Sequence, residues 1–233
     1  MSIHDGHRAR LKNRFLEQGL DGFDDHQALE LLLFYALPRI DVNTLAHRLL
    51  HYFGSLDRVF EASVEELCQV EGIGESTALL LRLIPQLNRR CQIRQNQPCK
   101  TITSATQAWQ YLAPYFLDTR EEMVYLLCLD HRQRILSCTL LAKGEADCAN
   151  FSIRRLVETV VSRKAAGVIL AHNHTSGVAL PSADDISTTR HLKKALDAVG
   201  VYLQDHLILA GNDFVSLAAS GDLDDTPAFS SIN

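Results

Sequence analysis

The sequence predicts an α+β protein of two domains, an all-helical domain followed by a mixed α/β domain. Apolar residues recur at helical spacing before residue 90. After residue 104, short apolar runs typical of strands alternate with amphipathic helices. The stretch between them is polar, contains a proline and has no period. We therefore expect a helical domain over 1–92, a linker over 93–103, a mixed α/β domain over 104–218 and a flexible tail over 219–233.

Four helices are expected in the first domain. Asp24 and Asp41 stand where N-caps are needed, and Gly54 stands where a helix commonly ends. Ser63 and Glu66 have the spacing of a capping box. The predicted helices cover 24–37, 41–53 and 63–70, and the fourth follows a glycine hairpin within 71–87.

The second domain alternates helices and strands, which predicts a mixed sheet. Its first helix is expected to break late, at Pro114, and Gly200 is expected to stop its last long helix. The predicted helices cover 104–116, 152–166 and 182–200. The predicted strands cover 122–130, 134–144, 167–172, 201–211 and 213–218.

Composition limits the class of protein. The chain has 233 residues, 46% of them hydrophobic and 22% charged, and a formal net charge of −5. These are ordinary globular values, and the charge argues against a strongly basic nucleic-acid binder. The sequence begins without an apolar signal-like stretch, has no apolar run long enough to span a bilayer, and has six cysteines that form no CxxC pair. We therefore expect a cytoplasmic protein with no membrane partner.

The run VEGIGES (70–76) resembles the turn of a helix-hairpin-helix module. Gly72 and Gly74 would expose backbone N–H groups that suit a phosphate. Glu75 stands where such modules usually carry Lys or Arg, so we expect weak DNA binding at best. A purely structural αα-turn is the alternative. The cations of 7–14, with Arg89 and Arg90, could add a weak patch or could simply be a solvated face.

The run AHNHTSGVALPSADD (171–185) places two histidines at the end of an apolar strand. His172 and His174 are two residues apart, so their side chains share one face. After a loop, Ser182 starts a helix and Asp185 lies in its first turn. Two imidazoles and a carboxylate form a three-ligand set for zinc that leaves a position for water. The alternative is that Ser182 and Asp185 form only a capping box.

Two other metal sites are excluded by the pattern. The letters HNH do not make an HNH nuclease, whose residues spread over a longer stretch. The zinc deaminases need H-x-E and a later P-C-x-x-C, and the sequence has neither.

The run His172-x-His174-x(7)-Ser182-x(2)-Asp185 matches the metal motif of the JAB/MPN (JAMM) metalloprotease domain. Together with VYLQDHLIL further on, it resembles the RadC (UPF0758) family of that superfamily. The helical half, including the glycine hairpin, also resembles RadC, and the resemblance covers roughly residues 7–218.

The resemblance implies specific roles. His172, His174 and Asp185 would bind Zn²⁺, and Ser182 would steady a tetrahedral intermediate. An upstream glutamate that holds the metal-bound water would be Glu122, or Glu121 if the register slips by one. The implied activity is that of a zinc metallopeptidase-like hydrolase of an amide or isopeptide bond in a protein or peptide substrate.

The sequence departs from the usual RadC pattern at two places, and two other functions remain as alternatives. Thr175 stands where the family usually has Pro, and Ile153-Arg154-Arg155 stands where it often has Pro-Arg-Glu. Neither changes the ligand set, but both bear on access of a substrate. The alternatives are a DNA-associated repair or recombination factor with a metal-binding domain, and a non-catalytic metal-binding interaction module.

Overall fold

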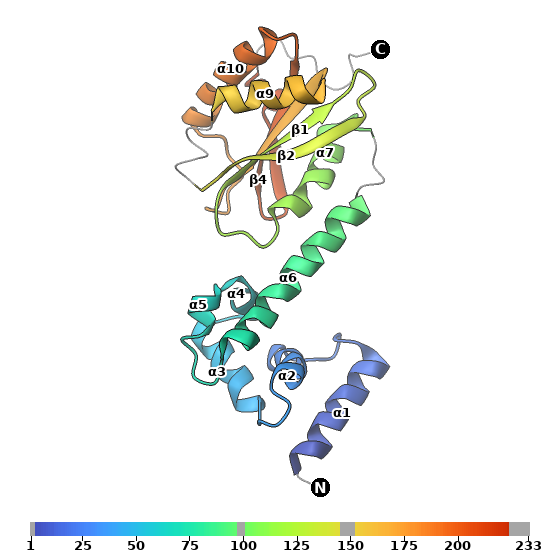
Figure 1. The fold of residues 1–233 in the computed structure, drawn as a ribbon, viewed down its shortest axis with the longest axis vertical. Coiled ribbons are helices and arrows are strands. Elements are labelled where there is room, and N and C mark those ends of the chain that lie inside the picture. Colours follow the sequence, from blue (N-terminus) through green and yellow to red (C-terminus); the bar gives the residue numbers. More distant parts are fainter. Residues whose placement is uncertain (1–2, 97–100, 145–151, 224–233) are drawn as a thin grey trace. The chain divides into compact units, whose positions relative to one another are not determined.

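The computed structural model describes residues 3–96, 101–144 and 152–223 of the chain. The chain divides into two compact units, Met1–Asn88 and Arg89–Asn233. The first is helical and the second contains a mixed sheet (Figure 1). This confirms the predicted α+β layout. No helix in the described ranges is long and apolar enough to cross a membrane.

The helices of the first unit pack around a leucine-rich core. Leu29, Leu33 and Leu49 are fully buried there, together with Leu67 and Leu81. The helices are α1 (Ile3–Gln18), α2 (Asp25–Ala36), α3 (Asn43–Phe53), α4 (Leu56–Glu61), α5 (Val64–Leu67) and α6 (Glu75–Asn96).

Most of the expected caps are present. Ser63 and Glu66 form the predicted capping box, and Gly54 ends α3 with φ +90°. Asp41 is not the N-cap of α3, because that helix begins at Asn43. Asp41 instead accepts the Asn43 N–H from outside the helix, at 3.0 Å. The carboxylate thus still satisfies a free N–H group of the first turn.

Helix α1 was not predicted, because its sequence has few apolar residues. Leu11 is the residue of α1 that is buried in the core, and polar contacts also hold the helix. Arg8 donates to the backbone oxygens of Leu37 (2.9 Å) and Pro38 (2.8 Å), and His7 contacts the buried Glu30 carboxylate at 2.9 Å. The expected cationic patch is thereby weakened, since the Arg8 guanidinium binds carbonyls of its own chain.

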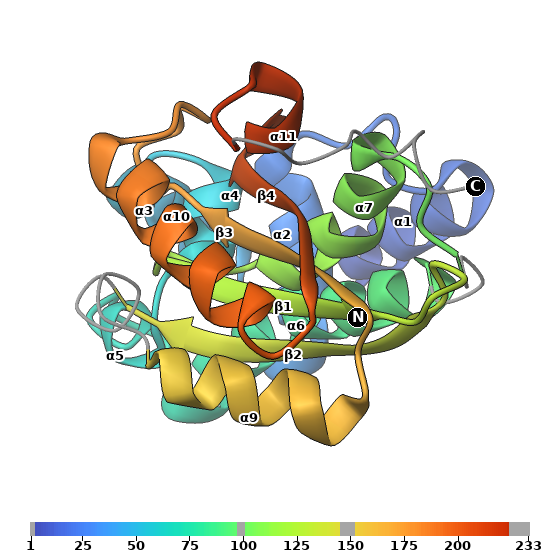
Figure 2. The same cartoon turned by 90° about the horizontal axis from the view of Figure 1, so that it is seen from above.

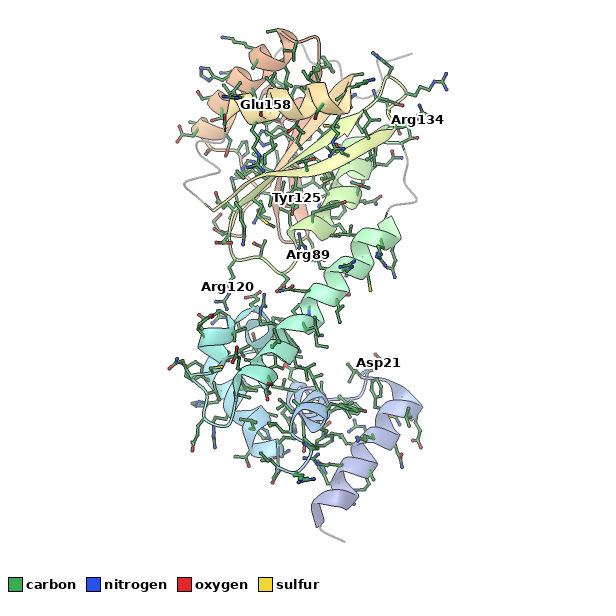
Figure 3. All side chains as sticks on the ribbon, in the orientation of Figure 1. Asp21, Arg89, Arg120, Tyr125, Arg134 and Glu158 are labelled. Atoms are coloured by element: carbon green, nitrogen blue, oxygen red, sulfur yellow. The ribbon has the colours of Figure 1, made fainter. Side chains whose placement is uncertain are left out.

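Helix α6 extends four residues into the expected linker. Its last turns are polar, which is typical of a linker, but Arg and Gln are also good helix formers. In the second unit Arg89 also anchors this end of the helix (Figure 3). Its guanidinium donates to the Tyr115 carbonyl at 2.7 Å and to the Tyr125 hydroxyl at 3.1 Å.

The second unit is built on a five-stranded sheet of order β2-β1-β3-β4-β5. Strands β3 and β4 are parallel, and the other neighbouring pairs are antiparallel. The strands are β1 (Met123–Leu129), β2 (Ile135–Lys143), β3 (Gly167–Asn173), β4 (Tyr202–Ala210) and β5 (Asp213–Ser216). The helices are α7 (Ala105–Leu112), the 3₁₀ helix η1 (Ala113–Phe116), α9 (Ile153–Arg163), α10 (Ala183–Asp197) and α11 (Leu217–Ser220).

Helices cover both faces of this sheet (Figure 2). One face packs against α9 and α10, and the other packs against α7. Alternate residues of β1 separate accordingly: Val124 and Leu126 lie on the α10 face, and Tyr125 and Leu127 lie on the α7 face. The central strand β3 is buried along its whole length, so its end is a rigid place for a site.

The end of the second unit differs from the prediction. The last strand stops at Ser216, and α11 follows, so the first residues of the expected tail are helical. Asp205 on β4 holds this corner by accepting the Ser216 hydroxyl (2.6 Å) and the Ala218 N–H (3.0 Å). Burial raises the pKa of Asp205 to about 6. Leu223 is buried, and residues 224–233 of the expected tail lie outside the described ranges.

Candidate metal centre

His172, His174 and Asp185 converge at one point of the second unit. The Nε2 atoms of the two histidines are 2.9 Å apart. His172 Nε2 lies 3.2 Å from Asp185 Oδ1, and His174 Nε2 lies 3.3 Å from Asp185 Oδ2. Three atoms that can ligate a metal therefore share one small volume.

Local structure explains this convergence. His172 is the penultimate residue of the central strand β3, and His174 follows the strand, where its N–H bonds to Leu209 O on β4 (2.8 Å). The following loop returns the chain to α10, whose N-cap is Ser182. Asp185 is the third residue of α10 and reaches back to the strand end, as the spacing predicted.

The capping box is also present. The Ser182 hydroxyl accepts the Asp185 N–H (3.0 Å), and Asp185 Oδ2 accepts both the Ser182 N–H (2.7 Å) and the Ser182 hydroxyl proton (2.6 Å). One carboxylate thus caps the helix and also joins the histidine cluster. The two interpretations of this sequence are compatible.

The cluster is rigid at its base and open at its rim. The His172 side chain is only 7% exposed, whereas those of His174 and Asp185 are 16% and 20% exposed. Partial burial alone would raise the pKa of the Asp185 carboxyl, but the neighbouring His172 ring and the hydrogen bonds from Ser182 outweigh it and hold the pKa well below its usual value. Asp185 is therefore ionised near neutral pH and attracts a cation.

A second layer lies behind the cluster, and our sequence analysis missed it. His172 Nδ1 is 2.7 Å from His206 Nε2 on β4, and His206 Nδ1 is 2.6 Å from the Thr189 hydroxyl on α10. Both residues are buried. Burial holds the pKa of His206 well below its usual value, so this ring is neutral near pH 7. The signal in the sequence was an Asp-His pair inside the apolar run VYLQDHLIL.

Glu122 immediately precedes β1, the strand that pairs with β3, and the cluster lies at the end of β3. Val124 pairs with His172 across the β1–β3 ladder. Glu122 is two residues before Val124, and His174 is two residues after His172. Because residues two apart on extended backbone share a face, this spacing puts Glu122 on the α10 face, on the same side as the two histidines.

Glu121 is next to Glu122 in sequence, so its side chain lies on the opposite face of the sheet. It shares the face of Met123, which packs in the core on the α7 side. Its carboxylate lies 2.6 Å from Lys143 Nζ, and more than half of its side chain is exposed. Of the two glutamates, the geometry therefore favours Glu122 as the neighbour of the cluster.

The backbone around Glu122 is held by a residue that our sequence analysis also missed. Asn173 lies between the two histidines, and its side-chain amide bonds to the backbone before β1, where the backbone hydrogen bonds between β1 and β3 end. It accepts the Met123 N–H at 2.8 Å and donates to the Glu121 carbonyl at 3.1 Å. On the β2 side, the Glu122 carbonyl accepts the Gly144 N–H at 2.7 Å. The peptide groups on both sides of Glu122 are thereby fixed relative to the histidine strand.

Arg155, which departs from the usual family pattern, lies away from the cluster at the edge strand β2. Its guanidinium donates to the Leu141 carbonyl (2.6 Å) and the Leu140 carbonyl (3.2 Å), beside a register shift of the β1–β2 pair. The basic residue thus satisfies carbonyls that this edge would otherwise leave to solvent.

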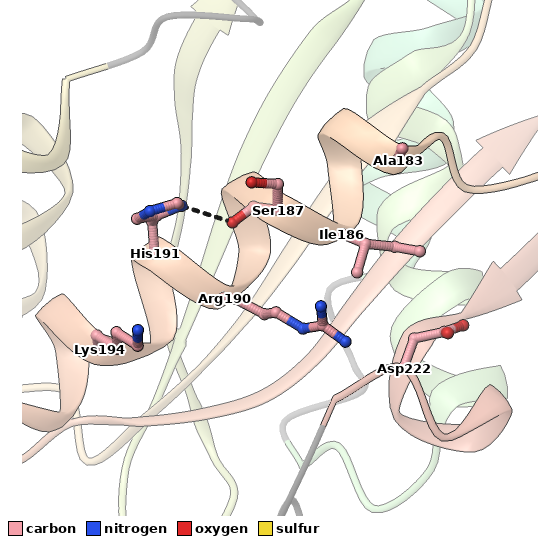
Figure 4. Close-up of a pocket in the computed structure, with 7 residues that line it drawn as sticks. All are labelled: Ala183, Ile186, Ser187, Arg190, His191, Lys194 and Asp222. Carbon is pink, nitrogen blue, oxygen red and sulfur yellow. Dashed lines mark hydrogen bonds between the residues drawn. The ribbon is translucent and has the colours of Figure 1, made fainter.

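A pocket of about 420 Å³ lies along the outer face of α10 and does not include the cluster residues (Figure 4). Arg190 and Lys194 are its basic residues, and the Arg190 side chain points toward Asp222. His191 lines it too, and its Nδ1 bonds to the Ser187 carbonyl at 2.8 Å. His191 is therefore a histidine of the same helix that stands apart from the cluster.

The glycine hairpin lies in the first unit, where its two glycines differ. Gly72 has φ +96°, and a Cβ there would meet Leu45 at 3.3 Å, so this glycine is needed for the fold. Gly74 has neither constraint, and nothing lies within 4 Å of a Cβ built on it. Its carbonyl accepts from Thr77 and Ala78, and α6 begins at the next residue, Glu75.

Comparisons with known proteins agree with this architecture. The family model described as a RadC-like JAB domain matches residues 102–222, and a helix-hairpin-helix model matches 55–84. The UPF0758 protein VP0184 of Vibrio parahaemolyticus is 32% identical over 210 residues, which is 90% of this chain and 94% of that protein. The UPF0758 protein FN0909 of Fusobacterium nucleatum is 30% identical over 223 residues, with 93% and 96% covered. The chain therefore belongs to the RadC-like JAB domain family, together with the UPF0758 proteins that it resembles over most of its length.

Proposed function

We propose that the chain is a zinc-dependent hydrolase that cleaves an amide or isopeptide bond in a peptide or protein. The observation that carries this proposal is the convergence of the ligand atoms of His172, His174 and Asp185 within 4.8 Å of one another. The JAB family match supports it, because that superfamily includes metalloproteases.

The geometry of the cluster fits zinc. Bonds of about 2.0–2.2 Å in a tetrahedral site place neighbouring ligand atoms roughly 3.3–3.6 Å apart. The three separations here, 2.9, 3.2 and 3.3 Å, lie at or just below this range, so a small outward shift of the side chains would complete the site. His174 also has the required tautomer. Its Nδ1 lies 3.2 Å from the Val178 carbonyl, which can only accept, so the neutral ring carries its lone pair on Nε2, toward the cluster.

Zn²⁺ held by these three residues would polarise the scissile carbonyl and lower the pKa of a water molecule at its open position to about 7. The Glu122 carboxylate would take a proton from the attacking water. The water oxygen adds to the carbonyl carbon, the C–N bond breaks, and Glu122 delivers the proton to the leaving nitrogen. The Ser182 hydroxyl, whose proton is donated to Asp185 Oδ2 in this structure, would turn that proton to the oxygen that gains negative charge.

Metal analysis of the purified full-length chain, combined with a hydrolysis screen, tests this proposal. We expect about one zinc ion per chain and cleavage of at least one member of a panel of fluorogenic peptides and lysine-linked isopeptides, abolished by a chelator and restored by zinc. Absence of bound zinc would contradict the metal centre. Stoichiometric zinc without hydrolysis of any panel member would instead favour a non-catalytic metal-binding interaction module.

A second, minor function is weak DNA contact by the first unit. The helix-hairpin-helix match supports it, and so does Gly74, which leaves space for a phosphate at the beginning of α6. Glu75 in the first turn of that helix opposes it by repelling a phosphate. This contact would place the hydrolase near DNA without making DNA its substrate.

Replacing Glu75 with lysine is expected to strengthen binding of a short DNA duplex, because it removes a repelling charge and adds a phosphate contact. The measurement is a salt titration monitored by fluorescence anisotropy, in which the Lys variant should also show the steeper dependence on salt. Glu71→Lys, a change of the same charge just before the hairpin, is the control. Tight binding by the unaltered chain, with no gain in Glu75→Lys, would contradict weak contact at this turn.

A further inference from the structure

A hydrogen-bonded chain runs from His172 into the interior. It leads from His172 Nδ1 to His206 Nε2 (2.7 Å), from His206 Nδ1 to the Thr189 hydroxyl (2.6 Å), and from that hydroxyl to the Asp185 carbonyl (2.5 Å). The three residues are almost completely buried, with exposed fractions, counted over the whole residue, of 5% for His172, 3% for His206 and 0% for Thr189. The chain thus joins β3, β4 and α10 behind the cluster.

The proton positions follow from its inner end. A carbonyl oxygen only accepts, so the Thr189 hydroxyl donates its single proton to Asp185 O. The hydroxyl oxygen must then accept from its other neighbour, which places a proton on His206 Nδ1. The remaining ring contact of His206 is with an imidazole, which provides no negative charge to stabilise a doubly protonated, buried ring.

In the neutral ring of His206 the lone pair is therefore on Nε2, which accepts the proton of His172 Nδ1. The neutral ring of His172 then has its own lone pair on Nε2, the atom that lies 3.2 Å from Asp185 Oδ1 and 2.9 Å from His174 Nε2. The opposite tautomer of His172 would put a proton where a metal must bind.

We infer that Thr189 and His206 are positioning residues that fix His172 in the tautomer whose Nε2 lone pair faces the cluster. The expected effect on metal affinity rests on the proposed function. The tautomer of His172 does not, because it is a property of the metal-free chain. Outer residues that orient a ligating histidine commonly change metal affinity about 10- to 100-fold. Here a threonine on the same helix as Asp185 performs this task through a second histidine.

The test uses the full-length chain labelled with ¹⁵N at histidine and freed of metal by a chelator. Long-range ¹H–¹⁵N correlation spectra report which ring nitrogen of His172 carries the proton. We expect the Nδ1–H form in the unaltered chain, a mixture of forms in Thr189→Val, which keeps the shape but removes the acceptor, and recovery of the Nδ1–H form in Thr189→Ser. Thr188→Val is the matched control and should leave His172 unchanged.

A zinc titration against a chromophoric chelator gives the second measurement. Thr189→Val should bind zinc about 10- to 100-fold more weakly than the unaltered chain, while Thr189→Ser and Thr188→Val should bind it about as tightly. Equal affinity of Thr189→Val and the unaltered chain would overturn the positioning role. If Thr189→Val does not fold, the inference is still tested by the His172 spectra of the unaltered chain and of Thr189→Ser, which should both show the Nδ1–H form.

The two measurements separate this inference from the proposed function. An Nε2–H tautomer of His172 in the metal-free, unaltered chain would overturn the inference, whatever its zinc affinity. An Nδ1–H tautomer in a chain that binds no zinc would support the assigned proton positions and refute the metal centre.

Discussion

Replacing Glu122 with glutamine is expected to lower hydrolysis by about 10²-fold or more, the range for loss of a general base, and to leave bound zinc unchanged. Glutamine keeps the size of the side chain and a hydrogen-bonding oxygen but cannot take a proton from water. The measurements are turnover of the best substrate from the peptide and isopeptide panel and zinc content per chain, both on the full-length protein.

Glu121→Gln is the matched control for this change. Glu121 precedes Glu122 directly but has the opposite parity, and it pairs with Lys143 at the protein surface. Removing its charge should change turnover little, because the stability of the fold depends little on it: exposed ion pairs contribute about 0–1 kcal/mol to the free energy of unfolding. If Glu121→Gln removes activity and Glu122→Gln does not, the register of the base is wrong by one residue. If Glu122→Gln loses zinc, Glu122 is a ligand.

The local geometry of the cluster could be predicted from sequence because it depends on short-range periods. Two residues along a strand bring His172 and His174 to one face, and the Ser182-x-x-Asp185 spacing puts a carboxylate in the first turn of a helix. Both placements are present in the structure. These placements can be predicted without knowing which strands are neighbours in the sheet.

The second layer could not be predicted, because it depends on strand pairing. His206 is 34 residues from His172 and reaches it through the parallel register in which β4 lies beside β3. Asn173 contacts Met123 across 50 residues through the β1–β3 pairing. The choice between Glu121 and Glu122 has the same origin, since their parity becomes known only when Val124 is paired with His172.

Two helices, α6 and α1, differ from the prediction for another reason. Helix α6 continues into the expected linker because Arg and Gln support a helix without an apolar period, and Arg89 has partners in its own unit. Helix α1 was missed because hydrogen bonds of Arg8 and the contact between His7 and Glu30 hold it, and such contacts leave no periodic signal. Hydrophobic periodicity detects helices held by a core and misses those held by polar contacts.

Replacing His174 with alanine is expected to abolish stable zinc binding and, with it, the thermal stabilisation that zinc provides. A metal that binds only the folded state stabilises it by about 2.7 kcal/mol when its free concentration is 100 times its Kd. The midpoint of thermal unfolding of the unaltered chain should therefore rise on adding zinc and fall on adding a chelator. His174→Ala should show neither shift, while its metal-free midpoint stays near that of the unaltered chain.

His191→Ala is the control, since His191 lies on α10 but outside the cluster, and its Nδ1 bonds to the Ser187 carbonyl. It should keep the zinc-dependent rise of the unaltered chain. An equal rise in His174→Ala would show that zinc binds elsewhere, and the cluster would then not be the metal centre.

Asp185 needs a more careful substitution, because its carboxylate both caps α10 and lies beside the two histidines. Alanine would remove both contributions and leave the Ser182 N–H without its side-chain acceptor, so only the Ser182 half of the capping box would remain. Asn keeps an oxygen that can accept the Ser182 N–H but lacks the negative charge of a zinc ligand. Asp185→Asn should therefore keep most of the metal-free stability and lose the zinc-dependent rise. If the rise persists in this variant, Asp185 contributes only to the cap of α10, and the zinc site must be held by other residues.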